Sequence, residues 1–579
     1  MFSDKLQEYA QKKYEQRLPV LGKIGEVVAG KLPLCTKEEQ ILMKFFYGTM
    51  PLRDAGEYEF EVFLGFVRHS LMVYRTMEWC REVPEEIFLH HILYYRINSE
   101  NIEDCRKFFY EKLIDRIKGK TLQEAVLEIN YWCAENGSYE ASDHRTISPL
   151  VLYRSGKGRC GEESTFAVTA FRSVGVPARQ VYAPWWAHCD DNHAWVEVYI
   201  EGKWHFLGAC EPEEILDRGW FVNASSRALL IHTRNFSDYG DDLGEPCVGR
   251  EDRIWFYNVT AGYAKARQFE IRVLEEDGRA VGQADVFVEV LNSGEYHSVA
   301  KLCTNEEGKA SILIGLGSIH LRIVKGKKGR EVTVNTRVQE SAAVVIREDW
   351  FAEGQGEWTQ LDLEAPEDSP IHRTLMSKEQ KDRSLRKLCR ANEIRSGRIE
   401  GYYVEEKAAR YPEEKEILHA AAGNFDEIYS FLDKDSNVDR RYLLHSLTVK
   451  DYKDAKAAIL EKHLGHASKY RERWEKAGKL DIYISYILCP RIYLEEMTYY
   501  REFIEKYFGG QAWLSDPFAI WGYIERTIGY DSAEDYGTIF TTPVGTLSLR
   551  FGNLVSRRIL FVAICRTFGI PARISPVNM

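Results

Sequence analysis

The stretch 156-GKGRCGEESTF-166 places three glycines around one cysteine and follows the cysteine with two glutamates. A buried structural cysteine needs no glycines beside it, whereas a nucleophilic one needs an open, sharply turned backbone and the start of a helix. Apolar residues then recur at helical spacing until Gly175 and Pro177 end the pattern. The stretch therefore predicts a helix that begins near Cys160 and carries a thiol at its first turn.

A thiol at a helix N-terminus can act as a nucleophile. The aligned backbone N–H groups lower the pKa of the thiol and can also hold an oxyanion. Glu162 and Glu163 suit the helix dipole but oppose a thiolate, so a cationic partner is needed. The best candidate is His193, which opens a predicted strand, because a Cys–His pair is the usual way to activate a thiol. A lone cysteine or histidine is more often structural, so the prediction rests on the two together.

Composition excludes several classes of function. The chain has 579 residues, 45% of them hydrophobic, and a net charge of −11 with a pI of about 5.9. An acidic surface argues against general affinity for nucleic acid or anionic membrane. There is no apolar run of about 18 residues, so no membrane span is expected. The 12 cysteines are scattered without a C-x-x-C motif, which favours free thiols and a cytoplasmic location.

The character of the sequence changes along the chain and predicts a multidomain α+β protein. A segment with helical periodicity comes first, and next a segment with the Cys160 helix and a hairpin that turns at Glu201-Gly202. Short strands with Asp-Gly, Glu-Gly and Lys-Gly turns follow, which is typical of a β-sandwich. The predicted segments are 1–135 (helical N-terminal domain), 136–265 (catalytic core), 266–350 (β-sandwich), 351–436 (linker and helices) and 437–579 (second copy of the N-terminal units).

The last segment is predicted from an internal repeat. The sequence that starts at Glu86 aligns with the one at Asp481, a spacing of 395, and 173-SVGVPAR-179 aligns with 567-TFGIPAR-573, a spacing of 394. On this alignment Leu554 replaces Cys160, and the chain ends before any counterpart of His193. The copy is therefore expected to be chemically inert. It is either cut short or a half-domain that packs onto the N-terminal regions, so Leu554→Ala should lower stability without changing the thiol.

Two motifs resemble a known family. The sequences 158-GRCGEES-164 and 192-NHAWVEVYIEGKWHFLGACEPEEILDRGW-220 resemble the transglutaminase-like superfamily, whose core is papain-like. Within it the motifs are most similar to those of peptide:N-glycanases, over roughly residues 136–230. The resemblance implies that Cys160 is the nucleophile and His193 the base. The strands of 266–350 resemble carboxypeptidase-regulatory-like or prealbumin-like modules, which are usually spacers or binding units.

The sequence also departs from the family pattern. The family's third catalytic residue is an aspartate at the end of the strand that follows the histidine, and this chain has Gly208 there. Glu211 is our first candidate for an acid that orients the imidazole or binds substrate, and Asp217 is the second. The zinc-binding cysteine pairs of peptide:N-glycanases are absent.

Four residues are candidates for substrate binding. Trp185 and Trp186 could line a cleft or pack in the core, and Asp191 belongs to a polar loop beside the predicted cleft. Trp195 shares the predicted strand with His193. The loop 188-HCDDNH-193 could in principle hold a metal, but its spacing is not that of a closed zinc site. No metal or other cofactor is predicted.

The sequence therefore predicts a cysteine enzyme that acts on an amide bond through Cys160 and His193. Hydrolysis of a peptide, protein or glycopeptide, as by a protease, amidase or peptide:N-glycanase, is favoured over cross-linking. The alternative is a catalytically weakened or inactive protein of the same fold that binds peptides or glycans, and Gly208 is the residue that favours it. The β-sandwich is expected to contribute no catalytic group.

Overall fold

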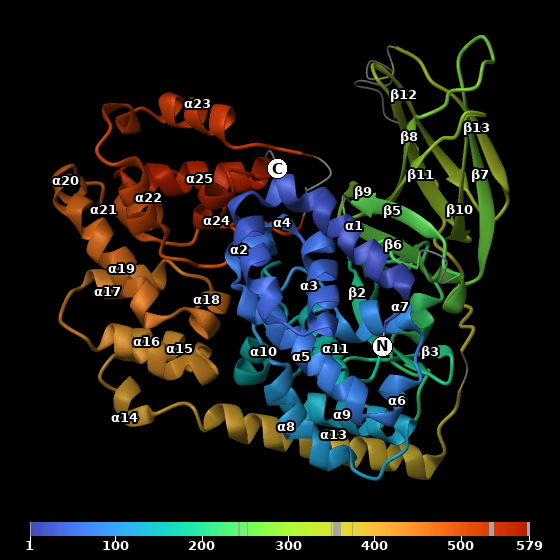
Figure 1. The fold of residues 1–579 in the computed structure, drawn as a ribbon, viewed down its shortest axis with the longest axis horizontal. Coiled ribbons are helices and arrows are strands. Elements are labelled where there is room, and N and C mark those ends of the chain that lie inside the picture. The colour runs from blue at the N-terminus through green and yellow to red at the C-terminus, as the bar shows by residue number, and fades with distance from the viewer. Residues whose placement is uncertain are drawn as a thin grey trace.

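The computed structural model describes residues 2–240, 244–251, 253–348, 350, 360–372, 374–531 and 538–575. Helical regions from both ends of the chain lie beside a central antiparallel sheet, and two smaller sheets project from one side (Figure 1). The predicted α+β class is confirmed. Among the described residues, no helix combines the length and the apolar character needed to cross a membrane.

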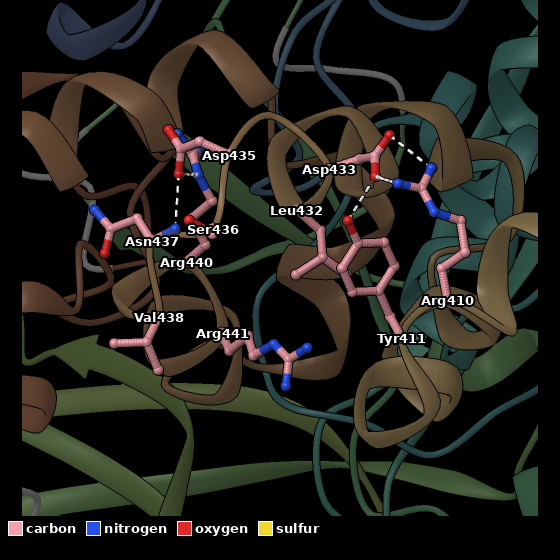
Figure 2. A pocket seen from close by; sticks show the side chains of 10 residues that line it. All are labelled: Arg410, Tyr411, Leu432, Asp433, Asp435, Ser436, Asn437, Val438, Arg440 and Arg441. Atoms are coloured by element: carbon pink, nitrogen blue, oxygen red, sulfur yellow. Dashed lines mark hydrogen bonds and ion pairs between the residues drawn. The ribbon is translucent and has the colours of Figure 1, made fainter.

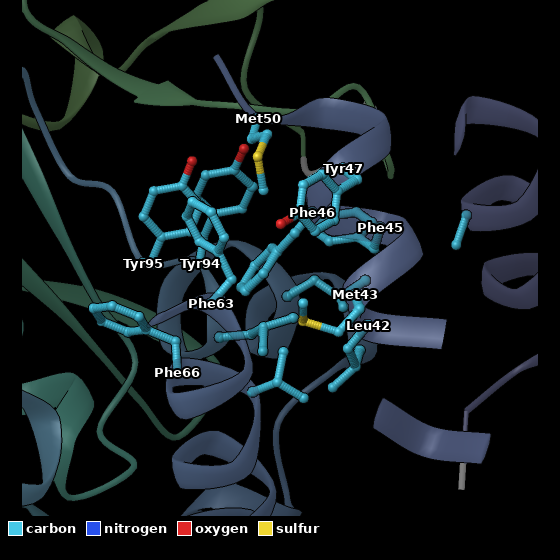
Figure 3. Packing of buried hydrophobic residues seen from close by; sticks show 14 of the residues in the cluster. Leu42, Met43, Phe45, Phe46, Tyr47, Met50, Phe63, Phe66, Tyr94 and Tyr95 are labelled. Carbon is cyan, nitrogen blue, oxygen red and sulfur yellow. The ribbon is translucent and has the colours of Figure 1, made fainter. Parts of the chain in front are cut away.

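The N-terminal helices enclose an aromatic core. Phe46 packs edge-on against Tyr94 and Tyr95, with ring centroids 5.5 and 5.2 Å apart (Figure 3). Such edge-to-face pairs stabilise a core beyond the area that they bury. The helices are α1 (Asp4–Leu21), α2 (Lys23–Lys31), α3 (Lys37–Thr49), α4 (Leu52–Glu57), α5 (Phe60–Thr76), α6 (Glu78–Arg81) and α7 (Glu85–Phe88), and α7 continues into the π-helical turn η2 (Leu89–Leu93).

The predicted catalytic core is built around one buried helix. The helix begins at Cys160, as predicted, and packs on strands β1 and β2. The predicted hairpin turns at Glu201-Gly202, where both residues have positive φ. The helices are α8 (Arg106–Ile117), α9 (Leu122–Asn136), α10 (Pro149–Ser155), α11 (Cys160–Ser173) and α12 (Val222–Ser225). The sheet has the order β3-β2-β1-β4-β6-β5, from β1 (Ala178–Ala183), β2 (His193–Ile200), β3 (Lys203–Leu207), β4 (His232–Asn235), β5 (Cys247–Glu251) and β6 (Ile254–Asn258).

A β-sandwich follows this core. One sheet has the order β10-β7-β13 and the other β12-β11-β8-β9, and alternate Val, Ile and Leu side chains fill the space between them. The strands are β7 (Ala266–Leu274), β8 (Asp285–Asn292), β9 (Glu295–Cys303), β10 (Lys309–Gly315), β11 (Ser318–Lys325), β12 (Lys328–Asn335) and β13 (Ser341–Val345).

The C-terminal region is helical. Its first and longest helix, α13, lies along α9, and Arg395 on α13 donates to the Gly137 carbonyl. The helices are α13 (Lys378–Glu400), α14 (Glu405–Ala408), α15 (Lys415–Ala420), α16 (Phe425–Leu432), α17 (Asp439–His445), α18 (Val449–Asp454), α19 (Ala457–Ala467), α20 (Arg471–Lys476), α21 (Leu480–Tyr483), α22 (Tyr500–Phe508), α23 (Pro517–Thr527), α24 (Pro543–Leu549) and α25 (Leu554–Thr567), with the π-helical turn η7 (Ile484–Leu488) after α21.

A cavity of about 500 Å³ lies among these helices (Figure 2). It is lined by three arginines, and each has a carboxylate partner. The pairs are Arg410–Asp433, Arg440–Asp435 and Arg441–Glu413. The cavity therefore presents no uncompensated arginine to an anionic ligand.

Similar contacts recur in both halves of the chain, at positions close to the spacing of the predicted repeat. The arginine just beyond each π-helical turn is buried against an aspartate, and an arginine near the end of α11 or α25 donates to the carbonyl that follows the turn. The contacts are Arg96–Asp54 and Arg491–Asp451 (both 2.5 Å), and Arg172 to the Tyr94 carbonyl and Arg566 to the Cys489 carbonyl (2.7 and 2.8 Å). Two copies of one unit would show this agreement.

Leu554 begins α25, as Cys160 begins α11. Its side chain is 52% exposed. An exposed leucine has little burial to lose, so the expected loss of stability on Leu554→Ala does not follow from this structure.

Candidate active site

The Cys160 sulfur lies against the segment that carries His193. Sγ is 4.0 Å from Oδ1 of Asn192, and the backbone N–H of Ala194 contacts the sulfur. These two residues flank His193 at the start of β2. The helix start and the strand start therefore meet at the predicted nucleophile.

Electrostatics at Cys160 favour the thiol over the thiolate. Burial raises the pKa of Cys160, and the Glu163 carboxylate raises it further. The N–H groups of Ala194 and Gly161 and the Arg159 guanidinium lower it, but by less. The resting side chain is consequently a neutral thiol at neutral pH.

His193 is the first residue of β2 and is only 8% exposed. Its ring lies between aromatic side chains, with centroid distances of 4.7 Å to Trp220 and 5.2 Å to Phe221. Burial lowers the pKa of His193 to about 4, so the imidazole is neutral at pH 7. Nε2 is buried without a hydrogen-bond partner, and within the described ranges no hydrogen bond joins His193 to Cys160.

The Glu211 carboxylate lies close to Gly208. A Cβ on Gly208 would lie 2.4 Å from Oε2 of Glu211, so the carboxylate fills space that a side chain at position 208 would need. Oε1 accepts a hydrogen bond of 2.9 Å from the Trp220 indole, and Oε2 is buried without a partner among the described residues. Burial raises the pKa of Glu211 to about 7. Glu211 therefore contacts the tryptophan that covers His193.

Asp217, the second candidate acid, is bonded to a different histidine. Its carboxylate lies 2.8 Å from Nδ1 of His205 and accepts a hydrogen bond of 3.0 Å from the Phe206 backbone N–H. These contacts hold Asp217 against β3. The structure therefore gives it no contact with His193.

The three tryptophans predicted to bind substrate pack inside the protein. Trp186 and Trp195 are 3% and 0% exposed, and the Trp195 indole donates to the Tyr263 hydroxyl at 3.0 Å. Trp195 lies two residues along β2 from His193, so both side chains face the same side of the sheet. That side is buried, and Trp195 stacks there on Phe221. Trp185 is half-buried and stacks on His297 of the β-sandwich, with centroids 3.9 Å apart. None of the three rings is exposed beside Cys160.

The loop between β1 and β2 is attached to the β-sandwich. The Asn292 amide donates to the carbonyls of Trp186, Cys189 and Asp191 at 3.0, 2.9 and 3.2 Å. Asp191 is exposed, and its carboxylate caps the Asn192 backbone N–H at 2.8 Å. The sandwich thus helps to fix the loop that brings Asn192 to Cys160.

The same loop holds two histidines, a cysteine and two aspartates, which are possible metal ligands. The Asp190 carboxylate accepts a hydrogen bond of 2.7 Å from the Ser293 backbone N–H, and the Cys189 side chain is exposed. No cluster of three or more metal-binding side chains is found among the residues that the structure describes.

Sequence reasoning missed two exposed aromatic residues at this site. Trp220 is 63% exposed, and Tyr139 is 59% exposed. Burial and the nearby Cys160 sulfur both raise the pKa of Tyr139. Trp220 stands in the Gly-Trp stretch of the family resemblance, which could have identified it. No comparable sequence signal marks Tyr139.

A cysteine at the first turn of a helix, packed against the strand start that carries a histidine, is an arrangement of residue types found in cysteine acyl-transfer enzymes. The transglutaminase-like superfamily profile matches residues 111–209, a range that includes Cys160 and His193. The chain therefore carries a transglutaminase-like core.

Comparison with solved structures finds a "putative cysteine protease" from Cytophaga hutchinsonii. It is 20% identical over 24% of this chain and 45% of its own length, with a TM-score of 0.19. This chain thus matches less than half of that protein. Comparison with curated proteins gives no match.

Proposed function

We propose that this protein is a cysteine hydrolase with a transglutaminase-like core that cleaves amide bonds in peptides, proteins or glycopeptides. The observation that carries the proposal is the contact of Cys160 Sγ with the strand start at His193. A reducing compartment such as the cytoplasm suits this chemistry, and none of the twelve cysteines forms a disulfide.

In the proposed reaction the thiol proton moves to the imidazole as Sγ attacks the substrate carbonyl carbon. Burial keeps Cys160 a thiol and His193 a neutral base, so proton transfer accompanies attack. Because Nε2 is buried, Nδ1 is the nitrogen proposed to take the proton. Backbone N–H groups at the start of α11 stabilise the oxyanion. The C–N bond then breaks, and His193 returns the proton to the amine.

Water completes the proposed cycle. His193 removes a proton from the water as its oxygen attacks the thioester carbonyl, and the Cys160 sulfur leaves and regains the proton. The products are a carboxylic acid and an amine, so the cycle needs no oxidant or reductant.

Glu211 is the proposed positioning acid. It holds the Trp220 indole at 2.9 Å, and the Trp220 ring covers His193. Oε2 of Glu211 and Nε2 of His193 are both buried without partners in the described part of the chain.

The second candidate is a peptide- or glycan-binding protein that has lost turnover. The unpartnered Nε2 of His193 favours it, because no acid holds the imidazole in the described residues. The raised pKa of Cys160, which burial causes, favours it too. This candidate predicts a thiol no more reactive towards acyl donors than an ordinary cysteine.

Acylation by p-nitrophenyl acetate at pH 7.5, followed by mass spectrometry of each cysteine, separates the two candidates. The hydrolase proposal expects Cys160 to be acylated at least about tenfold faster than exposed Cys389, and His193→Gln to abolish the difference. Equal rates at Cys160 and Cys389 would favour the binding protein.

A further inference from the structure

Glu162 organises the backbone around Cys160. It lies two residues beyond the cysteine, and its side chain is buried. Oε2 accepts a hydrogen bond of 2.7 Å from the Arg159 backbone N–H, and Oε1 accepts one of 3.0 Å from the Ile147 backbone N–H. Glu162 therefore ties the loop before α10 to the first turn of the nucleophile helix.

The cation nearest to Glu162 comes from the other half of the chain, because Arg159 of its own half lies farther away, at 3.8 Å. Lys450, on α18, places Nζ 2.9 Å from Oε1 of Glu162 and is 1% exposed. The same ammonium donates to the Asp143 carbonyl at 2.6 Å and the Arg145 carbonyl at 2.5 Å. A buried ammonium is costly without such partners, and here every one of these acceptors belongs to the half that carries Cys160.

The packing of the two halves is reciprocal. Helix α18 of the C-terminal half contacts α10 of the N-terminal half, and α4 of the N-terminal half contacts α24 of the C-terminal half. Helices α4 and α18 therefore make corresponding contacts across the two halves. Lys450 precedes the buried Asp451, just as Arg53 precedes the buried Asp54. Lys450 and Arg53 therefore occupy equivalent places.

Among the described residues, only Lys450 forms an ion pair with the long helix of the facing half. That helix is α11 for Lys450 and α25 for Arg53. Glu162 is matched in α25 by Ser556, whose hydroxyl accepts from the Thr541 backbone N–H at 3.0 Å. Arg53 pairs instead with Glu57 of its own helix at 2.8 Å and with Glu496 of the C-terminal half at 3.5 Å, and neither glutamate lies on α25. Within the described residues, a Lys–Glu pair therefore reaches the helix that begins at Cys160, and no equivalent pair reaches the helix that begins at Leu554.

We propose that Lys450 is a positioning residue for Cys160, acting through Glu162 from the C-terminal half of the chain. The inference rests on the proposed role of Cys160 as nucleophile. A carboxylate in the first turn of α11 opposes a thiolate, and the Lys450 charge cancels it. The other charged groups near this pair are Asp143 and Arg159, and the titratable groups near the sulfur are Tyr139 and Glu163, whose pKa burial raises well above its ordinary value.

The test is the pH dependence of Cys160 alkylation by iodoacetamide in the full chain, read by mass spectrometry. Lys450→Met removes the nearest cation from Glu162, which keeps Arg159 at 3.8 Å as its ion-pair partner, and should raise the midpoint of the profile by about one pH unit. Lys450→Gln retains a donor for the two carbonyls and should give the same shift, and it serves if Lys450→Met does not fold. Lys450→Arg keeps the charge and should leave the midpoint unchanged.

Two further variants isolate the charge effect from packing. Lys450→Met combined with Glu162→Gln removes both charges and should return the midpoint to that of the wild type. Arg53→Met, the matched change in the other half, should lower the urea midpoint of unfolding without moving the alkylation profile. An unmoved profile in folded Lys450→Met or Lys450→Gln, or an equal shift in Arg53→Met, overturns the proposal.

The two proposals fail in different ways. If p-nitrophenyl acetate does not acylate Cys160 but Lys450→Gln still shifts the alkylation profile, the hydrolase proposal fails and the positioning role stands. If acylation occurs and the profile does not move, only the positioning role is lost.

Discussion

At the scale of single residues, Gly208 and Glu211 together form one feature of the candidate site. The missing side chain at 208 leaves room for a carboxylate that arrives three residues later. This carboxylate is buried with one partner, the Trp220 indole, in the described residues, and burial raises its pKa to about 7. A group in this state is a proton reservoir at neutral pH and destabilises the fold once it ionises.

Glu211→Gln should therefore stabilise the protein in alkaline solution. The folded pKa of about 7 exceeds the ordinary value of 4.5, so the folded state binds more protons between these pH values and loses stability as pH rises through them. The amide cannot ionise and can still accept from Trp220. We expect a gain of about 1 to 3 kcal/mol at pH 8 and almost none at pH 4, measured by urea unfolding.

Glu214 provides the matched control. Burial alone would raise its pKa, but hydrogen bonds from Lys387, Arg383 and Tyr131 lower it below the ordinary value. Glu214→Gln should accordingly lose stability at pH 8, by less than about 1 kcal/mol because the pairs are near the surface. An equal gain for Glu211→Gln at both pH values would contradict the assigned pKa.

The sequence allowed some of these residues to be placed and not others. Cys160 and His193 could be predicted because a glycine-flanked helix start and a strand start are local patterns. The burial of Trp186 and Trp195 could not be predicted, because it depends on which face of the sheet packs against α12 and the segment that contains Tyr263. The pairing of Asp217 with His205 is likewise set by the fold of the β3 edge.

At the scale of elements, the β-sandwich does more than separate two regions. No catalytic group was predicted in it, and Asn292 at the end of β8 holds the loop beside Cys160. Strand alternation and turn residues predicted the sandwich itself. The attachment could not be predicted, because a single asparagine at the end of a strand does not indicate its partner.

Asn292→Ala should loosen this loop. Three carbonyls lose a buried donor, which should cost about 1 to 3 kcal/mol of unfolding free energy. Asn192 would then be held less firmly, so we expect Cys160 alkylation at pH 8 to become several-fold faster. Mass spectrometry of the alkylated protein measures the rate.

Asn305→Ala is the control for this prediction. The Asn305 side chain caps a turn within the sandwich, where it accepts from the backbone N–H groups of Glu307 and Lys309. Its loss should lower stability and leave Cys160 unchanged. If both variants alter alkylation alike, the effect belongs to the sandwich as a whole and not to the loop contact.

At the scale of the whole molecule, buried ions join the two halves. Asp451 lies 2.5 Å from Arg491 in its own half and 3.4 Å from Arg145 in the half that carries Cys160. The repeat could be read from the spacing of similar residues, whereas these contacts connect positions some 300 residues apart and leave no local pattern. Only the fold reveals that the C-terminal half contacts the loop before the helix that begins at Cys160.

Asp451→Asn should therefore destabilise the whole chain. It leaves two buried guanidinium groups without their shared carboxylate, and removing one partner of a buried pair costs about 3 to 5 kcal/mol. Burial alone would raise the pKa of Asp451, but Arg491 and Arg145 lower it, so the loss of stability should also appear in wild-type protein as pH falls below the ordinary value near 4.

Asp454→Asn is the matched control. Asp454 is partly exposed and pairs with Arg145, and in this variant Asp451 still pairs with Arg145. We expect it to cost about 1 kcal/mol or less in urea unfolding. Equal costs for the two variants would show that Asp451 does not join the halves.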